Sequence, residues 1–190
     1  MPVLNSERSW GWVSRIIHWG TAGVLLWTMG LGIYMTNFVT DPFEQFPLFQ
    51  THKSWGFTVF VLALLRVIWL IFSPRRPELP SDAPAYERFG SKASHAALYL
   101  FIFLMPLSGW VMSAASPLQD LLGIENMVFG LFAMPDPWVP GVEWVETAAK
   151  NVHYFSGLAL FAVLLLHVGA ALKHHFVNRD DILKRMTYGG

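Results

Sequence analysis

Seven histidines are the residues of this chain best suited to chemistry, because the sequence contains no cysteine. Disulfides, thiolate zinc sites, cysteine-ligated iron–sulfur clusters and covalently attached c-type haem are therefore excluded. Five histidines fall within or at the edges of long apolar segments, where polar side chains are costly and usually functional. A single such histidine is more often hydrogen-bonded to a neighbouring helix, but five require a joint explanation. They are His18, His52, His95, His153 and His167.

The segments that carry these histidines are predicted to be membrane-spanning helices. The chain is 54% hydrophobic and only 14% charged, with a mean hydropathy of +0.41, which is too apolar for an ordinary soluble domain. Each apolar segment is close to the roughly 20 residues that a helix needs to cross a bilayer. A soluble bundle would show polar helix faces, which these segments lack. We expect one all-α domain over residues 1–190, an integral membrane four-helix bundle with spans at about residues 13–35, 54–72, 93–115 and 151–172.

The distribution of charge predicts the orientation of the helices. The 13 basic and 13 acidic residues cancel, so no basic field is available to bind nucleic acid. Most lysines and arginines fall on the side of the two termini, which predicts that both termini are cytoplasmic. The connections at about residues 36–51 and 116–150 then lie outside, and a short surface helix is expected near residues 142–150. The inner cations are Arg8, Arg15, Arg75, Arg76, Arg88, Lys92, Lys173, Arg179, Lys184 and Arg185.

The depth of each histidine follows from the alternating direction of the helices. His52 and His153 begin the second and fourth spans, so both lie near the outer face, whereas His18, His95 and His167 lie toward the inner face. On the fourth helix the two histidines are separated by about 21 Å of rise and point in similar directions. This pattern favours two metal centres, one outer and one inner. Opposed imidazoles from two helices are what a six-coordinate haem iron accepts.

The residue one helical turn after each histidine indicates which inner histidine pairs with His167. A flat macrocycle needs space on the same helix face at position i+4. His95 has Tyr99 at that position, which would crowd the ring, so His18 is the predicted partner of His167. Helix packing also favours small residues at such positions and is the alternative explanation of this pattern. The small neighbours are Gly56 after His52, Gly157 after His153, Ala22 after His18 and Ala171 after His167.

Four stretches of sequence resemble the bacterial cytochrome b561 family: RIIHW at residues 15–19, THKSWG at 51–56, His95 through Pro106 to Gly109, and HVGAALKHH at 167–175. The resemblance covers essentially the whole chain. It implies a multi-pass protein of the bacterial cytoplasmic (inner) membrane with two haem b groups. His18 and His167 would ligate the cytoplasmic-side haem and His52 and His153 the periplasmic-side one. A quinone site beside the inner haem is also implied, with His174 corresponding to the family's histidine there.

Three other inner residues are candidates for binding a haem or a quinone. Arg66 lies about 21 Å inward of His52 along its helix, where it could pair with a haem propionate or snorkel to the headgroups. Both interpretations of Arg66 remain open. His95 and His174 could each hydrogen-bond a quinone carbonyl and supply a proton, because imidazole titrates near neutral pH. At the membrane interface, however, His174 needs no special role.

The two outer cations flank the predicted outer haem ligands, since Lys53 follows His52 and Lys150 lies one turn before His153. They could steer an anionic electron donor to the outer haem, or they could anchor helix ends at the headgroups. Some members of the family resemble a superoxide oxidase, which takes electrons from periplasmic superoxide and reduces ubiquinone. The resemblance therefore favours transmembrane electron transfer from superoxide to ubiquinone, catalysed as a superoxide:ubiquinone oxidoreductase.

Two other functions are compatible with parts of this sequence. A cytochrome b electron-transfer subunit could dock a periplasmic dehydrogenase or a c-type cytochrome through the Trp- and Phe-rich residues 129–144. A haem-free metal transporter would use the same histidines but predicts acidic ligands inside the membrane. No aspartate or glutamate lies in any of the four predicted spans, which counts against the transporter.

Overall fold

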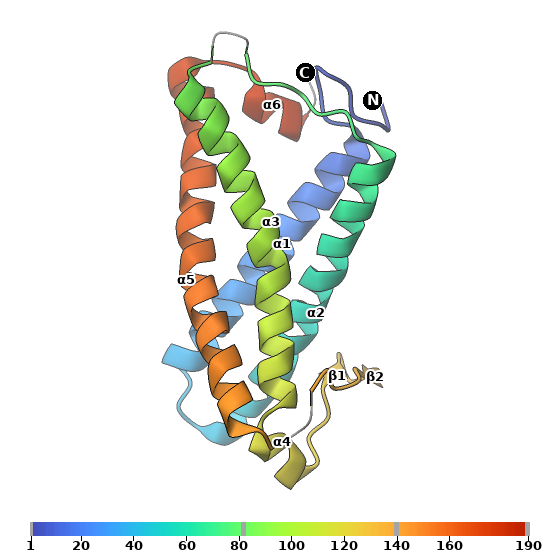
Figure 1. The fold of residues 1–190 in the computed structure, drawn as a ribbon, viewed down its shortest axis with the longest axis vertical. Helices are drawn as coiled ribbons and strands as arrows, with labels where there is room; N and C mark the ends of the chain where they lie inside the picture. The colour runs from blue at the N-terminus through green and yellow to red at the C-terminus, as the bar shows by residue number, and fades with distance from the viewer. Residues whose placement is uncertain (1, 81–82, 139–140, 189–190) are drawn as a thin grey trace. The chain divides into compact units, whose positions relative to one another are not determined.

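Four long helices make up most of the computed structural model, which describes residues 2–80, 83–138 and 141–188 (Figure 1). Each helix is long and apolar enough to cross a membrane, which confirms the predicted all-α membrane fold. The prediction that both termini are cytoplasmic stays a prediction. The helices are α1 (Trp12–Asn37), α2 (Pro42–Phe72), α3 (Ala85–Ala114) and α5 (Glu143–Lys173).

The helices extend beyond the apolar spans expected from the sequence. Helix α2 begins at Pro42 because Asp41 caps it: the Asp41 Oδ1 atom accepts the Phe43 backbone N–H at 2.8 Å, and proline suits the first helical position. The first outer connection is correspondingly shorter than residues 36–51. Residues 143–150 are helical, as expected, but they form the first turns of the long helix α5 instead of a short surface helix. The polar residues in the first turns of α2 and α5 lie outside the apolar segments that the sequence predicted, but they do not interrupt the helices.

Large apolar side chains cover the outward faces of the long helices, as expected where lipid replaces water. Exposed fractions reach 62% for Ile16, 73% for Ile71 and 71% for Leu166. The fully buried side chains are few and include Thr21, whose hydroxyl donates to the Ile17 carbonyl. Hydrophobic burial against other protein segments is therefore a small part of what holds these helices.

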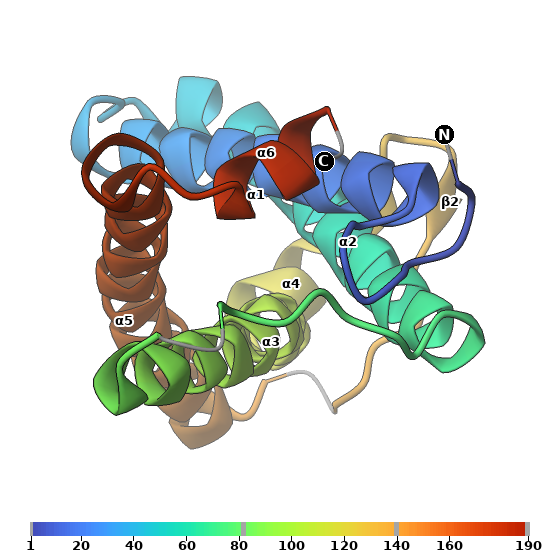
Figure 2. The same ribbon diagram turned by 90° about the horizontal axis from the view of Figure 1, so that it is seen from above.

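The chain divides into two compact units, and each long helix contributes residues to both. Unit 1 comprises Met1–Thr21, Leu62–Leu100 and Ala159–Gly190, and contains both ends of the chain, α6 (Ile182–Thr187) and a π-helical turn, η1 (His174–Asn178). Helix α6 lies beside the start of α1 (Figure 2), where the Trp19 indole donates to the Met186 carbonyl at 2.9 Å. Asn5 joins the N-terminal segment to Ser73 through two hydrogen bonds.

Unit 2 comprises Ala22–Val61 and Phe101–Leu158 and contains the long connection between α3 and α5. This connection forms a short helix, α4 (Pro117–Leu122), and a hairpin of β1 (Met127–Val128) and β2 (Phe132–Ala133), in which Met127 pairs with Ala133. The Ser54 hydroxyl accepts the Phe129 backbone N–H at 2.9 Å and donates to the Met127 carbonyl at 3.3 Å. The hairpin is thus fixed to α2 at Ser54, two residues after His52 in the sequence.

Candidate functional site

Unit 2 brings His52 of α2 and His153 of α5 face to face. Their ring centres are 6.3 Å apart, with an angle of 79° between the ring planes. The two residues are 101 positions apart in the sequence, so only the fold brings them together. Both rings are half-buried.

Hydrogen bonds fix which nitrogen of His153 carries the proton. Its Nδ1 atom lies 2.9 Å from the Met105 carbonyl oxygen and 3.2 Å from the Ser108 hydroxyl. A carbonyl can only accept, so Nδ1 carries the hydrogen and Nε2 keeps a free lone pair. The Nδ1 atom of His52 is buried without a hydrogen-bond partner in the described part of the chain. His153 is therefore held in the tautomer that binds a metal through Nε2.

Two glycines lie directly against these rings. A Cβ atom on Gly32 of α1 would stand 3.0 Å from Cε1 of His52, and one on Gly109 of α3 would stand 3.1 Å from Cε1 of His153. Both distances are shorter than ordinary van der Waals contacts. Glycine at these two positions thus lets each imidazole rest on the backbone of the next helix.

We expect Gly32→Ala to displace the His52 ring by a few tenths of an ångström. The displacement should shift the optical bands and the reduction potential of any metal that this ring ligates. Gly30→Ala is the matched control, because nothing lies within 4 Å of a Cβ atom built on Gly30. The measurement is a redox titration of the haem bands in both variants. Equal spectra and potentials in wild type and Gly32→Ala would contradict the expectation.

Unit 1 brings together His18 of α1, His167 of α5 and His95 of α3. The ring centres of His18 and His167 are 6.4 Å apart, at an interplanar angle of 52°. His95 is closer to His167, at 5.3 Å, and its side chain is exposed, whereas the other two are half-buried. The Nδ1 atom of His18 is buried without a hydrogen-bond partner among the described residues.

Arg66 of α2 lies among these unit 1 histidines, and its positive charge acts on all three rings. Its guanidinium stands over the Tyr99 ring, 5.4 Å from the ring centre, which is a cation–π contact. Within the described ranges no carboxylate pairs with this guanidinium. An arginine in a membrane-spanning helix without a protein counter-ion favours an anionic partner from outside the chain.

The remaining predicted residues are His174, Lys150 and Lys53. His174 begins the η1 turn and contacts Glu87 and Asp180. Lys150 is exposed near the start of α5. Lys53 is not a free surface cation: its Nζ atom donates to Asn126 Oδ1 at 3.1 Å and to Ser113 Oγ at 3.4 Å.

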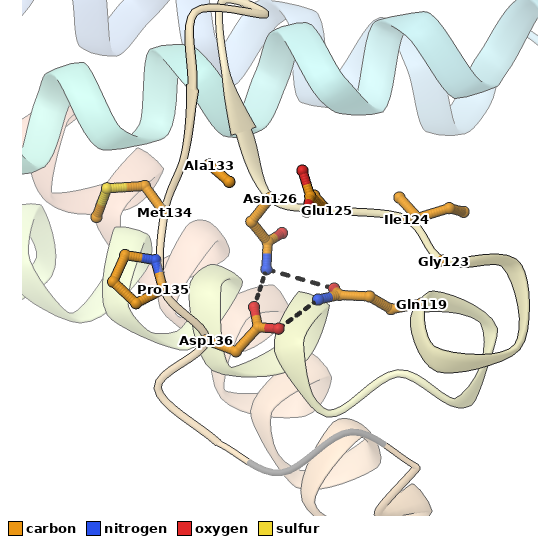
Figure 3. Close-up of a pocket in the computed structure, with 9 residues that line it drawn as sticks. All are labelled: Gln119, Gly123, Ile124, Glu125, Asn126, Ala133, Met134, Pro135 and Asp136. Atoms are coloured by element: carbon orange, nitrogen blue, oxygen red, sulfur yellow. Dashed lines mark hydrogen bonds between the residues drawn. The ribbon is translucent and has the colours of Figure 1, made fainter.

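The polar network around Lys53 was not predicted from the sequence. Asn126 is 1% exposed and donates from Nδ2 to Asp136 at 2.6 Å, while Gln119 donates to the other oxygen of Asp136 at 2.8 Å (Figure 3). These side chains line a hollow of about 520 Å³ in the connection between α3 and α5, and no predicted site residue borders it. The only sequence signal was polar residues within a Trp- and Phe-rich segment, which has no periodicity to interpret.

The two histidine pairs, His52 with His153 and His18 with His167, suit a metal that takes two protein ligands. Across residues 2–80, 83–138 and 141–188, no group of three or more metal-ligating side chains is gathered. Two bonds of about 2 Å to a shared metal, plus about 1 Å from each nitrogen to its ring centre, separate two ring centres by about 6 Å. The spacings of 6.3 and 6.4 Å match this value, and the 5.3 Å between His95 and His167 is too short. Both matching pairs therefore have the spacing that two histidines would need to hold one haem iron between them.

Comparisons with known proteins give a matching family and several relatives of this chain. The family described as prokaryotic cytochrome b561 matches residues 9–189. Cytochrome b561 homolog 2 of Escherichia coli (strain K12) is 30% identical over 98% of this chain and 95% of its own length. Cytochrome b561 homolog 1 of the same strain is 27% identical over 72% of this chain and 73% of its own. A probable superoxide oxidase, CybB, of Yersinia pestis is 27% identical over 71% of this chain and 72% of its own.

Proposed function

The chain belongs to the prokaryotic cytochrome b561 family, and on that premise we propose that it carries electrons from superoxide to ubiquinone through two haem b groups. The family consists of membrane proteins that bind haem b and transfer electrons, and this chain has the four helices such a protein needs. In the proposal residues 1–190 act as one domain of the bacterial inner membrane, with both termini cytoplasmic.

The observation that carries the proposal is the presence of two imidazole pairs at the spacing that axial haem ligands require. His52 and His153 would hold the periplasmic-side haem, and His18 and His167 the cytoplasmic-side one. When bound, the haems supply one-electron redox chemistry, and the chain supplies ligation and a low-polarity environment. Arg66 would pair with a propionate of the cytoplasmic-side haem, because no carboxylate of the described chain neutralises it.

The proposed donor and acceptor follow from charge and position. Superoxide is a small anion, and Lys53 and Lys150 provide positive charge beside the outer ligands. The relative from Yersinia pestis is named a probable superoxide oxidase, which supports the same donor. Ubiquinone would be reduced in unit 1, where His174 supplies an imidazole to its carbonyl and His95 is a second candidate contact.

A second candidate function is electron transfer to or from a protein docked on the outer connection. Exposed apolar side chains favour it: Leu131 is 79% exposed, Phe132 54% and Trp144 72%. A periplasmic dehydrogenase or a c-type cytochrome could pack against such a surface. The membrane interface would cover the same side chains equally well.

The test is a stopped-flow experiment on the purified, oxidised holoprotein. Superoxide is pulsed onto the protein and the haem bands are followed with and without added ubiquinone. We expect rapid haem reduction, then reoxidation that depends on ubiquinone. Haem bands that do not respond to superoxide, but respond to a reduced c-type cytochrome, would overturn the proposed donor in favour of a docked protein.

We expect the double substitution Lys53→Gln/Lys150→Gln to slow haem reduction by superoxide on the order of tenfold, the lower end of electrostatic steering. Glutamine at position 53 keeps N–H donors for Asn126, so the outer connection should stay in place. The measurement is the second-order rate constant at several salt concentrations, which should lose most of its salt dependence.

Lys92→Gln is the control for the lysine prediction, since Lys92 is exposed and belongs to unit 1. Its rate should equal that of wild type. An uncharged one-electron reductant should reduce all three proteins equally fast. A double variant with the wild-type rate and the wild-type salt dependence would show that the lysines only anchor helix ends.

A further inference from the structure

His174 lies between two carboxylates at the end of α5. Its Nδ1 atom is 2.5 Å from Asp180 Oδ2, and its Nε2 atom is 3.9 Å from Glu87 Oε2. All three side chains are largely shielded, with exposed fractions of 12% for His174, 17% for Asp180 and 11% for Glu87. A histidine that merely ended a helix at the headgroups would not need a carboxylate on each side of its ring.

The backbone after α5 turns back so that Asp180 lies next to His174. Helix α5 changes to the π-helical turn η1, and Arg179 then adopts a left-handed conformation with φ of 56°. Non-glycine residues rarely adopt positive φ, and such backbone strain and π-turns gather at functional sites. The Asp180 backbone N–H donates to the His174 carbonyl at 3.1 Å, which closes the turn.

Asp180 determines which nitrogen of His174 faces away from it. Two groups compete for Nδ1: the Asp180 carboxylate at 2.5 Å and the Asn178 amide nitrogen at 3.2 Å. The charged acceptor is closer and forms the stronger hydrogen bond, so Nδ1 carries a hydrogen and donates it to Asp180. Nε2 is then the nitrogen that exchanges a proton with a ligand.

The Nε2 atom of His174 forms no hydrogen bond within the described residues. Glu87 Oε2 is 3.9 Å away, beyond hydrogen-bond distance but close enough for one water or one carbonyl oxygen to lie near both. Glu87 is itself fixed, because Lys173 Nζ donates to its Oε1 atom at 2.5 Å. The charged groups facing the imidazole are therefore Glu87 from α3, Lys173 from α5 and Asp180 from the segment after η1.

We infer that Asp180 is a positioning residue that holds His174 with Nε2–H toward a quinone carbonyl bound beside Glu87. This inference rests on the proposed function. Quinone reduction consumes two electrons and two protons, and the two electrons come from two superoxide ions that leave as dioxygen. For the proton that the facing carbonyl receives, the His174 Nε2–H bond breaks and an O–H bond forms on the quinone, while the other carbonyl takes its proton from water. The imidazole becomes neutral, keeps Nδ1–H on Asp180, and regains its Nε2 proton from water.

The test compares Asp180→Asn with Asp181→Asn in the haem-loaded protein, following ubiquinone reduction after haem reduction. We expect Asp180→Asn to lower the maximal rate on the order of 10- to 100-fold, as removal of a partner that orients a functional histidine does. The KM for ubiquinone and the haem spectra should change little. Asp180→Glu should restore part of the rate.

Asp181→Asn is the matched control. Asp181 is the next residue, but it pairs with Arg185 at 2.8 Å instead of His174, and this contact lowers the pKa of the Asp181 carboxyl. The control therefore removes one negative charge from the same segment without touching the imidazole, and its rate should equal that of wild type. Equal slowing by both variants would reduce the effect to a general change of charge and overturn the role of Asp180.

His174→Ala separates failure of this inference from failure of the proposed function. Slow ubiquinone reduction in His174→Ala with a wild-type rate in Asp180→Asn would overturn the inference and leave the quinone site at His174. A wild-type rate in both variants would overturn the inference together with the assignment of His174. Absence of ubiquinone reduction in the wild-type protein would instead overturn the proposed function.

Discussion

Replacing His52 or His153 by alanine is expected to remove one haem b from the protein and to leave the other bound. Each substitution deletes one of two imidazoles whose ring centres are 6.3 Å apart, and the described chain gathers no third ligand to replace it. A haem that these two histidines would hold should bind weakly when one of them is removed. The haem-to-protein ratio should fall from two to one in either variant.

The retained haem reports whether the protein is still folded, so loss of the outer haem cannot be confused with unfolding. His175→Ala is the control, because His175 belongs to neither pair and its ring lies against Phe176. It should keep both haems. Two haems in His52→Ala or in His153→Ala would contradict the assignment of that residue, whatever the spectra of the other variants.

The four helices and the paired histidines could be predicted because both depend on local patterns. Apolar length predicts a spanning helix, and the position of a histidine along that helix predicts its depth. His52 and His153 were paired in this way, and the structure places their rings together. Helix ends were less predictable, because capping by Asp41 and the continuous start of α5 extend the helices into polar sequence.

The outer connection could not be predicted because contacts with the rest of unit 2 determine its structure. Asn126 is buried only because Lys53, Ser113 and Asp136 converge on its side-chain amide. Lys53 is 73 residues from Asn126, whereas Ser113 and Asp136 are 13 and 10 residues from it, and no spacing rule links the four positions. The sequence left open whether Lys53 steers an anionic donor or anchors a helix end at the headgroups, and the hydrogen bonds that fix its side chain could not be predicted.

The contact between His174 and Asp180 was missed for a related reason. The turn that joins them requires a left-handed residue, which sequences usually mark with glycine or asparagine. Here Arg179 takes that conformation, so the sequence carried no turn signal. Glu87 reaches the same imidazole from α3, 87 residues earlier in the chain. Only the assembled fold could reveal a histidine with a carboxylate on each side.

For the inner pair, we expect His18→Ala and His167→Ala each to remove the cytoplasmic-side haem while His95→Ala keeps both haems. Three imidazoles lie together in unit 1, so the choice of partner for His167 is a real alternative. The 6.4 Å between His18 and His167 leaves space for a metal between the rings, whereas 5.3 Å between His95 and His167 does not. His95 is also exposed, unlike the half-buried His18.

The measurement is again the haem-to-protein ratio, combined with low-temperature spectra that resolve the two haems. The haem lost in His18→Ala should be the one retained in His52→Ala, because the two substitutions lie in different units. Loss of a haem in His95→Ala with both haems kept in His18→Ala would exchange the roles of the two histidines. In that case the ring of His95 must move away from His167 when haem binds, and the small residue Ala22 one turn after His18 would serve helix packing alone.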